Sequence, residues 1–162
     1  MKKELSVDFN LRATWQAISR MYNHYGNPFD ISVASGFVLI NIDKKNGTPA
    51  TKIAPLVGLE PRSLSRLLKS LEDRNLIYKR NDAFDKRSVR VFLSEEGQLK
   101  RELSKMAIKL FNHKVLESVG EDKYMIFLEV INSIRETIDQ PDLFSEIESK
   151  ASVISKRLDE LK

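Results

Sequence analysis

The sequence predicts a mainly α-helical protein with a small β-hairpin near its middle. Apolar residues recur at the three- and four-residue spacing of amphipathic helices on both sides of that hairpin. A glycine-containing turn joins two short helices just before it, which is typical of a helix-turn-helix. Strict alternation of apolar and polar residues follows, as in a half-buried strand. The order over Ala50–Leu93 is therefore helix, turn, helix, strand, loop and strand, the arrangement of a winged helix-turn-helix.

Ala50–Val57 is predicted to form the first helix of the pair. Its apolar side chains are expected to pack inward, namely Ile53, Ala54, Leu56 and Val57. Pro55 is tolerated only near the first helical turn, because proline lacks a backbone N–H. It lies at the edge of that range if the helix begins one or two residues into this segment. Gly58 suits a left-handed helix end, and Leu59 is expected to fill the angle between the two helices.

Pro61–Asp73 is predicted to form the second helix, with two chemically different faces. At 100° per residue one face is a leucine stripe, made of Leu64, Leu67, Leu68 and Leu71. The opposite face carries three cations and short hydroxyls: Arg62, Arg66 and Lys69, with Ser63, Ser65 and Ser70 beside them. Pro61 suits the first turn of a helix. Glu60 is an unusual N-cap residue, although its negative charge favours a helix N-terminus.

Leu76–Arg80 and Ser88–Leu93 are predicted to be the two strands of the hairpin. In the second strand the residues expected to face inward are Val89, Val91 and Leu93. The loop of residues 81–87 is polar and rich in turn formers, so we expect it to be the wing. Five cations lie in and beside it: Lys79, Arg80, Lys86, Arg87 and Arg90. Arginine is well suited to a narrow minor groove or to bidentate phosphate contacts.

The positive charge of the chain is concentrated in the same segment. The whole chain has a net charge of +4, from 27 Lys and Arg against 23 Asp and Glu. Between Thr48 and Leu93 there are ten cations and five anions, so this segment carries +5 and the remainder −1. A basic stretch is often only a solvated face. Here the cations lie on the outer face of a helix and on a wing, which favours nucleic acid binding through counterion release.

Thr51–Leu93 resembles the winged helix-turn-helix of the MarR (multiple antibiotic resistance regulator) family of bacterial transcription factors. The matching motifs are Lys52-Ile53-Ala54, Val57-Gly58-Leu59, Leu64-Ser65-Arg66-Leu67, Leu71-Glu72-Asp73-Arg74-Asn75-Leu76-Ile77 and Asp85-Lys86-Arg87-Ser88. The last of these fits the family's Asp-x-Arg wing signature. The resemblance implies that Asp85 braces the wing and that Arg87 enters the minor groove of DNA.

We therefore predict a DNA-binding set of twelve residues. Those expected at the major groove lie on the second helix: Arg62, Ser63, Ser65, Arg66 and Lys69. Those expected at phosphates are Lys79, Arg80 and Arg90, and Lys52 on the first helix completes the basic surface. Lys86 and Arg87 are expected at the minor groove, with Asp85 as their brace.

The remaining segments are predicted to be amphipathic helices that flank this module, which divides the chain into residues 1–47, 48–93 and 94–162. Phe9–Tyr25 and Ile31–Asp43 form the N-terminal part, and Ser94 is a good N-cap for a long helix that follows the wing. Further helices follow Gly120 and Pro141.

These flanking helices carry more apolar surface than a small winged helix can cover. The resemblance implies that they interlock between two subunits, so we expect a homodimer that reads a palindromic operator in double-stranded DNA. Alternatively, the helices fold back on their own subunit. The segment after Pro141 either caps the dimer or is an exposed tail.

Composition argues against several other classes of protein. There is no cysteine, which excludes disulfides and thiol switches. His24 and His113 are the only histidines, and no nucleophile motif or glycine-rich phosphate loop occurs, so we predict neither an enzyme nor a metal or cofactor site. The apolar run Val33–Ile40 is too short to span a bilayer, and no signal peptide is evident. We expect a cytoplasmic protein without membrane contact.

Five aromatic residues near the first two helices form a second candidate site: Trp15, Tyr22, Tyr25, Phe29 and Phe37. Either they line a pocket for a small-molecule effector, as the resemblance implies for this region, or they are simply core.

The sequence thus predicts a sequence-specific DNA-binding transcriptional regulator, namely a homodimeric repressor released by a small-molecule effector. The alternative is a winged-helix module that binds proteins and not DNA, because fold alone does not decide function. Such a module would usually lose the cations of the second helix, which this chain keeps.

Overall fold

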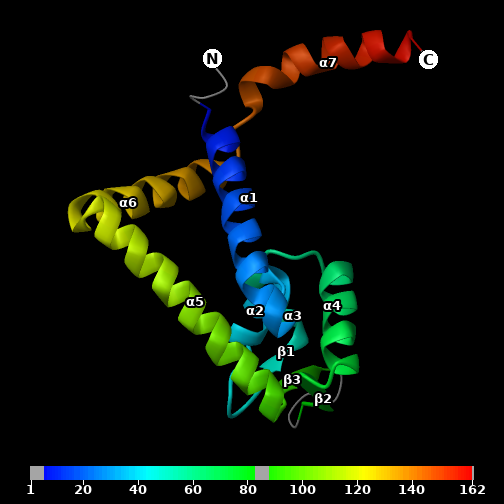
Figure 1. The fold of residues 1–162 in the computed structure, drawn as a ribbon. Helices are drawn as coiled ribbons and strands as arrows, with labels where there is room; N and C mark the ends of the chain where they lie inside the picture. The colour runs from blue at the N-terminus through cyan, green and yellow to red at the C-terminus, as the bar shows by residue number, and fades with distance from the viewer. Residues whose placement is uncertain (1–5, 83–87, 162) are drawn as a thin grey trace. The chain divides into compact units, whose positions relative to one another are not determined.

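The computed structural model describes residues 6–82 and 88–161 and is mostly helical (Figure 1). Its helices are α1 Val7–Gly26, a short 3-10 helix η2 Asn27–Phe29, α2 Val33–Ile40, α3 Ala50–Val57, α4 Pro61–Asp73, α5 Glu95–Val119, α6 Glu121–Ile138 and α7 Ser145–Asp159. Its strands are β1 Thr48–Pro49, β2 Ile77–Asn81 and β3 Val89–Leu93. The predicted fold class, mainly α with a small β-wing, is confirmed. The chain forms two compact units, Met1–Phe111 and Asn112–Lys162.

The core of the first unit lies between the helix-turn-helix, α2 and the sheet. Its buried side chains are Val38, Leu39, Ile42, Ile53, Leu64, Leu68, Leu71, Leu76, Ile77, Val91 and Leu93. The predicted leucine stripe of α4 is part of it, since Leu64, Leu68 and Leu71 are at most 4% exposed and Leu67 packs against them. Full burial of one such side chain contributes about 1.5–3 kcal/mol. The stripe therefore fixes which side of α4 faces solvent.

The turn between α3 and α4 has the predicted chemistry. Gly58 ends α3 in the left-handed conformation at φ +64°, where a residue without Cβ is unstrained. The Leu59 N–H then donates to the Ala54 carbonyl at 3.2 Å. Both helices keep the bounds expected from the sequence.

The interior of α3 holds one unusual residue and one difference from the prediction. Because the helix begins at Ala50, directly after β1, Pro55 lies in its second turn, deeper than the tolerated first turn. The prediction that Leu56 packs inward is wrong, because this side chain is 60% exposed. At 100° per residue the buried side of α3 runs through Ile53 and Val57, and Leu56 falls past its edge.

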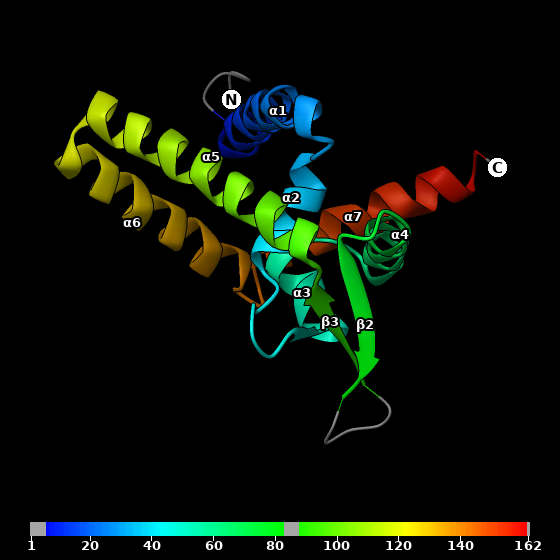
Figure 2. The ribbon, with the colours of Figure 1, turned by 60° about the horizontal axis from the view of Figure 1, so that its bottom comes forward.

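The sheet is antiparallel and three-stranded, in the order β1-β3-β2. β2 and β3 form the predicted hairpin, with Arg80 opposite Arg90, and Figure 2 shows the hairpin projecting away from α3 and α4. β1 pairs with β3 so that Pro49 lies opposite Arg90. The sequence did not predict β1, because two residues cannot display alternation. Val89 was expected to face inward but is 39% exposed, since it is the β3 residue nearest the wing.

Hydrogen bonds at the N-terminal end of α2 set where this helix begins. The Ser32 hydroxyl accepts from the Ser35 N–H at 3.1 Å, and the Ser35 hydroxyl accepts from the Ser32 N–H at 2.8 Å. The Ile31 N–H donates to the Gly26 carbonyl at 3.0 Å. Helix α2 is therefore shorter than the predicted segment Ile31–Asp43. Glycine is required at position 26, because an added Cβ would lie 2.1 Å from the Ile31 carbonyl oxygen.

Large apolar side chains remain exposed outside the core. Those on the flanking helices of the first unit include Val7, Leu11, Trp15, Leu99, Met106 and Leu110. In the second unit they lie on α6 and α7 and include Met125, Ile126, Phe127, Val130, Ile138, Ile147, Ile154 and Leu158. None of the helices in the described ranges is long and apolar enough to cross a bilayer. The predicted apolar stripes of the flanking helices are thus exposed in part, while members such as Ile18, Tyr22 and Leu103 are half-buried.

Helix α5 begins in close contact with the chain that follows α4. Ser94 caps it as predicted, because the Gly97 N–H donates to the Ser94 hydroxyl at 3.0 Å. The Ser94 N–H in turn donates to the Leu76 carbonyl at 3.1 Å. An added Cβ at Gly97 would lie 1.9 Å from that carbonyl oxygen, so the start of α5 has no room for a side chain at this position.

Gly97→Ala should therefore destabilise the fold by about 2–3 kcal/mol, because the obstructing atom belongs to the backbone and cannot rotate away. The free energy of unfolding in urea measures this. Gln98→Ala, at an exposed position of the same turn, is the matched control and should change it by less than about 0.5 kcal/mol. A Gly97→Ala protein as stable as the wild type would contradict the close contact.

Candidate nucleic-acid interface

Helix α4 presents a basic, hydrophilic face to solvent. The predicted contact residues of α3 and α4 are all exposed: Lys52, Arg62, Ser63, Ser65, Arg66 and Lys69. On α4 they lie opposite the buried leucine stripe, as the helical periodicity predicts. The Ser65 hydroxyl donates to the Pro61 carbonyl at 2.9 Å, so its oxygen can still accept a hydrogen bond. With 13 residues, α4 is about 20 Å long, which suits a helix lying in a major groove.

The predicted wing residues Asp85, Lys86 and Arg87 lie outside the described residues. Their roles as brace and minor-groove contacts stay predictions from the family resemblance. The described stem of the wing is closed by the Asp82 N–H, which donates to the Ser88 carbonyl at 2.9 Å.

Arg80 is held by an aromatic plate on the outer face of the hairpin. The Tyr78 and Phe92 rings are stacked, with centroids 5.4 Å apart and an interplanar angle of 9°. The Arg80 guanidinium carbon lies 4.9 Å from the Tyr78 centroid and 5.6 Å from that of Phe92. Both distances are within the range of a cation–π contact. A cation–π contact uses none of the guanidinium N–H groups as a hydrogen-bond donor, so it is compatible with a phosphate contact.

Lys79 lies on the opposite side of β2 and has a partner within the chain. Its ammonium is 2.6 Å from Glu72 Oε2 at the end of α4, and the two side chains are 30% and 40% exposed. Exposed pairs of this kind contribute little stability. Lys79 can therefore leave Glu72 at small cost to the stability of the fold. Its contact with a DNA phosphate stays a prediction from the sequence.

Arg90 differs from the other predicted phosphate contacts. Its guanidinium donates to the carboxylate of Asp82 and to two backbone carbonyl oxygens, those of Asn46 and Gly47. Asp82 is 8% exposed, so this pair is largely withdrawn from water. The sequence did not predict these partners of Arg90. Asp82 was counted only as one of the five anions of the segment, and a backbone carbonyl acceptor cannot be recognised from residue type.

The turn that receives Arg90 is organised by Asp43. Asp43 Oδ1 accepts from the Asn46 N–H at 2.7 Å and from the Lys45 N–H at 2.9 Å. These two bonds, the one from Asn46 more strongly, hold the pKa of the Asp43 carboxyl below its ordinary value. The Asp43 N–H also donates to the Thr48 hydroxyl at 2.9 Å, which ties the turn to β1.

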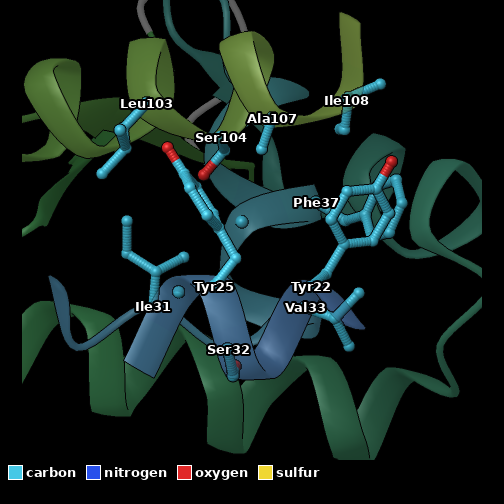
Figure 3. Close-up of a pocket in the computed structure, with 12 residues that line it drawn as sticks. Tyr22, Tyr25, Ile31, Ser32, Val33, Phe37, Leu103, Ser104, Ala107 and Ile108 are labelled. Atoms are coloured by element: carbon cyan, nitrogen blue, oxygen red, sulfur yellow. The ribbon is translucent and has the colours of Figure 1, made fainter. Parts of the chain in front are cut away.

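A pocket lies in the first unit between α1, α2 and α5 (Figure 3). It encloses about 370 Å³ of empty space, part of which is open solvent. Its lining residues are Tyr22, Tyr25, Gly26, Ile31, Ser32, Val33, Gly36, Phe37, Leu103, Ser104, Ala107 and Ile108. No charged side chain is among them. Its polar side-chain groups are the hydroxyls of two tyrosines and two serines, and partial burial raises the pKa of Tyr22 above its ordinary value.

The predicted aromatic cluster is divided between this pocket and its surroundings. Tyr22, Tyr25 and Phe37 line the pocket. Trp15 does not, but its ring centroid lies 5.9 Å from that of Phe37, and Phe29 is at the same distance from Tyr25. The cluster is therefore a pocket wall with two supporting rings.

Comparison with known proteins agrees with this geometry. Residues 31–89 match the model of the MarR family. SarZ, an HTH-type transcriptional regulator of Staphylococcus aureus (strain USA300), is 25% identical over 125 residues, which are 76% of this chain and 80% of SarZ.

Within residues 31–89, the chain has the winged helix of the MarR family.

Solved structures share the fold. The S. aureus MepR–DNA complex has a TM-score of 0.76 at 18% identity and covers 82% of this chain and 98% of MepR. CouR from Rhodococcus jostii RHA1, bound to p-coumaroyl-CoA, has a TM-score of 0.69 at 23% identity and covers 85% of this chain and 92% of CouR. SarZ is a transcriptional regulator and not an enzyme, which agrees with the function class predicted from the sequence.

The two histidines of the chain take no part in the candidate sites. His24 lies in the last turn of α1, and His113 pairs with Glu117 at 3.1 Å in α5. Across residues 6–82 and 88–161, no three His, Cys, Asp or Glu residues are grouped to hold a metal ion.

The Asp43 turn should loosen in acid. Because its pKa is lowered in the folded state, the stabilisation is complete above the ordinary aspartate pKa and is lost as pH falls through the lowered value. NMR titration should show the Asp43 carboxyl titrating below the ordinary pKa, with faster exchange of the Lys45 and Asn46 amides over the same range. In Asp43→Asn that pH dependence should vanish. A midpoint at the ordinary aspartate value would contradict the assignment.

Proposed function

We propose that this chain is a sequence-specific DNA-binding repressor that works as a homodimer and is released from DNA by a small-molecule effector. The observation that carries the proposal is the two-sided character of α4, whose leucine stripe is buried while its opposite face offers two arginines, a lysine and serines. A helix held by its apolar side can insert its polar side into the major groove at a defined depth. The MepR structure, solved with DNA, supports this use of the fold.

In the proposed complex, α4 reads bases and its neighbours hold the DNA backbone. Arg62, Ser63, Ser65, Arg66 and Lys69 meet the major groove, and Lys52, Lys79 and Arg80 contact phosphates. Arginine can bond two acceptors of guanine at once, which is the basis of much direct readout. Lys86 and Arg87 meet the minor groove with Asp85 as brace, in keeping with the family resemblance.

The exposed apolar faces support a homodimer. Side chains such as Leu11, Trp15 and Leu110 are 39–58% exposed, and contiguous apolar surface of this kind commonly marks an interface. In this arrangement residues 48–93 bind DNA, while residues 1–47 and 94–162 join the subunits. Two recognition helices related by a two-fold axis and spaced about 34 Å apart read a palindromic operator. We also expect a cytoplasmic location.

The pocket supports a small-molecule effector, and its chemistry restricts the ligand class. A charged ligand would lose hydration without gaining an opposite charge, because the lining is uncharged. We therefore propose an uncharged, largely apolar ligand with a hydroxyl or carbonyl group that bonds to Tyr22, Tyr25 or Ser104. CouR, whose structure holds p-coumaroyl-CoA, supports ligand binding by this fold.

The second candidate function is a protein-binding winged helix. The observation in its favour is the exposed aromatic and apolar surface of the hairpin, where Tyr78 is 38% exposed. Such a module has no use for the basic face of α4, so DNA binding is the better supported function.

The wild-type protein should bind a duplex from the region upstream of its own coding sequence, and the binding should weaken steeply with salt. Arg66→Ala should weaken specific binding by about 1–3 kcal/mol. It should also reduce the difference in affinity between the specific duplex and unrelated DNA, as measured by fluorescence anisotropy. Ser70→Ala, exposed at the edge of the same face, is the control and should bind like the wild type. Salt-independent binding, or none, would overturn the proposal.

Light scattering should give a mass near twice the 18.6 kDa of one chain. Leu110→Glu should shift the equilibrium towards monomer, because a charge in an apolar interface is poorly solvated. Lys109→Glu places the same charge at the neighbouring exposed position and should leave the mass unchanged. A wild-type mass near that of one chain would rule out the homodimer.

The pocket should bind 4-ethylphenol at least about tenfold more tightly than 4-ethylbenzoate, because the carboxylate would be buried without a cation. Trp15, the only tryptophan, contacts the pocket wall through Phe37, so its fluorescence measures both affinities. Ala107→Phe should fill the pocket and abolish the response to the phenol. Equal affinities for the two compounds, or an unchanged response in that variant, would contradict the assignment.

A further inference from the structure

Arg90, on the central strand β3, has every nitrogen of its guanidinium group bonded within the chain. Its Nε donates to Asp82 Oδ2 at 2.9 Å, and its Nη2 lies 2.8 Å from the same oxygen. Its Nη1 donates to the carbonyl oxygens of Asn46 at 3.1 Å and Gly47 at 3.2 Å. The planar fork of arginine suits such a set of acceptors, and the point charge of a lysine does not.

These bonds join two segments that are far apart in the sequence. Asp82 and Arg90 flank the wing, whereas Asn46 and Gly47 belong to the turn between α2 and β1, 44 and 43 residues before Arg90. The turn is pressed against β3, because a Cβ added to Gly47 would lie 2.6 Å from the Val91 carbonyl oxygen. Arg90 therefore ties the stem of the wing to a turn that is anchored in the fold.

The same bonds compensate for an unfavourable pairing of charges. Arg80 and Arg90 are directly opposite each other on β2 and β3, and like charges at such positions destabilise a sheet. Arg80 lies over the aromatic plate instead of turning toward Arg90. The side chain of Asp82 is 9% exposed, so its carboxylate would be poorly hydrated if Arg90 were removed.

We propose that Arg90 is a positioning residue for the DNA complex: with Asp82 it clamps the β2–β3 hairpin to the Asn46–Gly47 turn and so holds the hairpin in the orientation that DNA binding requires. The inference rests on the proposed DNA-binding function. It replaces the phosphate contact that the sequence suggested for Arg90. A phosphate would have to compete with a buried carboxylate and two carbonyl oxygens for the same N–H groups.

Three variants and one control separate the two roles. Arg90→Lys keeps the charge and loses the fork, Arg90→Met loses both, and Asp82→Asn removes the charge of the partner. Asn46→Ala is the control, because Asn46 takes part through its backbone carbonyl. Affinity is measured by fluorescence anisotropy over a range of salt concentrations. The probes are labelled duplexes of roughly 30 base pairs, long enough for two half-sites, that tile the region upstream of the chain's own coding sequence.

The clamp predicts that all three variants weaken binding by about tenfold. The slope of log affinity against log salt should stay at the wild-type value, because no phosphate contact is lost. The effect of Asp82→Asn is the most telling, since removal of an anion near DNA would otherwise strengthen binding. Combining it with Arg90→Met should add little, because both changes break one clamp. The control should bind like the wild type.

A phosphate-contacting Arg90 gives the opposite results. Arg90→Lys would then bind nearly as well as the wild type, Arg90→Met would reduce the salt slope by about 0.9, and Asp82→Asn would bind more tightly. Any of these outcomes would overturn the proposal.

Hydrogen exchange tests the clamp without DNA. Arg90→Met and Asp82→Asn should accelerate exchange of the Gly47 and Asp82 amides, which donate to the Asp43 and Ser88 carbonyls. The amides of α4 should stay protected, which distinguishes a local loosening from unfolding. Unchanged exchange at both sites would overturn the clamp. A wild-type protein that binds no duplex would contradict the proposed DNA-binding function and not the clamp. Hydrogen exchange, which needs no DNA, would then be the test of the clamp.

Discussion

The fold of the first unit depends on the burial of one leucine stripe. Leu64, Leu68 and Leu71 of α4 pack against Ile53 of α3 and the inner face of the sheet. Because that contact excludes water from one side of α4, the basic side is obliged to face solvent. Gly58 sets the angle at which α3 enters this contact. The exposure of the basic face of α4 is thus a result of the burial of its leucine face. A change that disrupts the leucine packing would therefore also disorder the basic face.

Strand β3 links this core to the wing. Val91 and Leu93 point into the core, while Arg90 and Phe92 point to the opposite face of the sheet. β3 therefore positions the hairpin relative to α4 through its buried side chains. Its other face carries Arg90, which binds Asp82, and Phe92, which stacks on Tyr78. The pocket lies in the same unit and is lined by residues of α1, α2 and α5. Packing within a single unit therefore supports both the basic face and the pocket.

Sequence alone identified the features that depend on neighbouring residues. The bounds of α3 and α4, the left-handed Gly58 and the Ser94 cap all follow from local spacing or backbone preference. Features that depend on distant partners were missed. The acceptors of Arg90 lie up to 44 residues away and include backbone carbonyls, which no residue type reveals. The exposure of Leu56 was missed for a related reason, because only the packed fold defines which side of α3 is covered.

Strand β1 has a consequence for how copies of this chain can meet. It is the edge strand of the sheet, has two residues, and ends in Pro49. A proline offers no N–H to an approaching strand, and a strand this short gives little surface for pairing. The opposite edge, β2, carries Lys79 and Arg80, which repel a second copy of themselves. Both edges of the sheet thus resist strand addition, so self-association is directed to the apolar helices and away from open-ended β-aggregation.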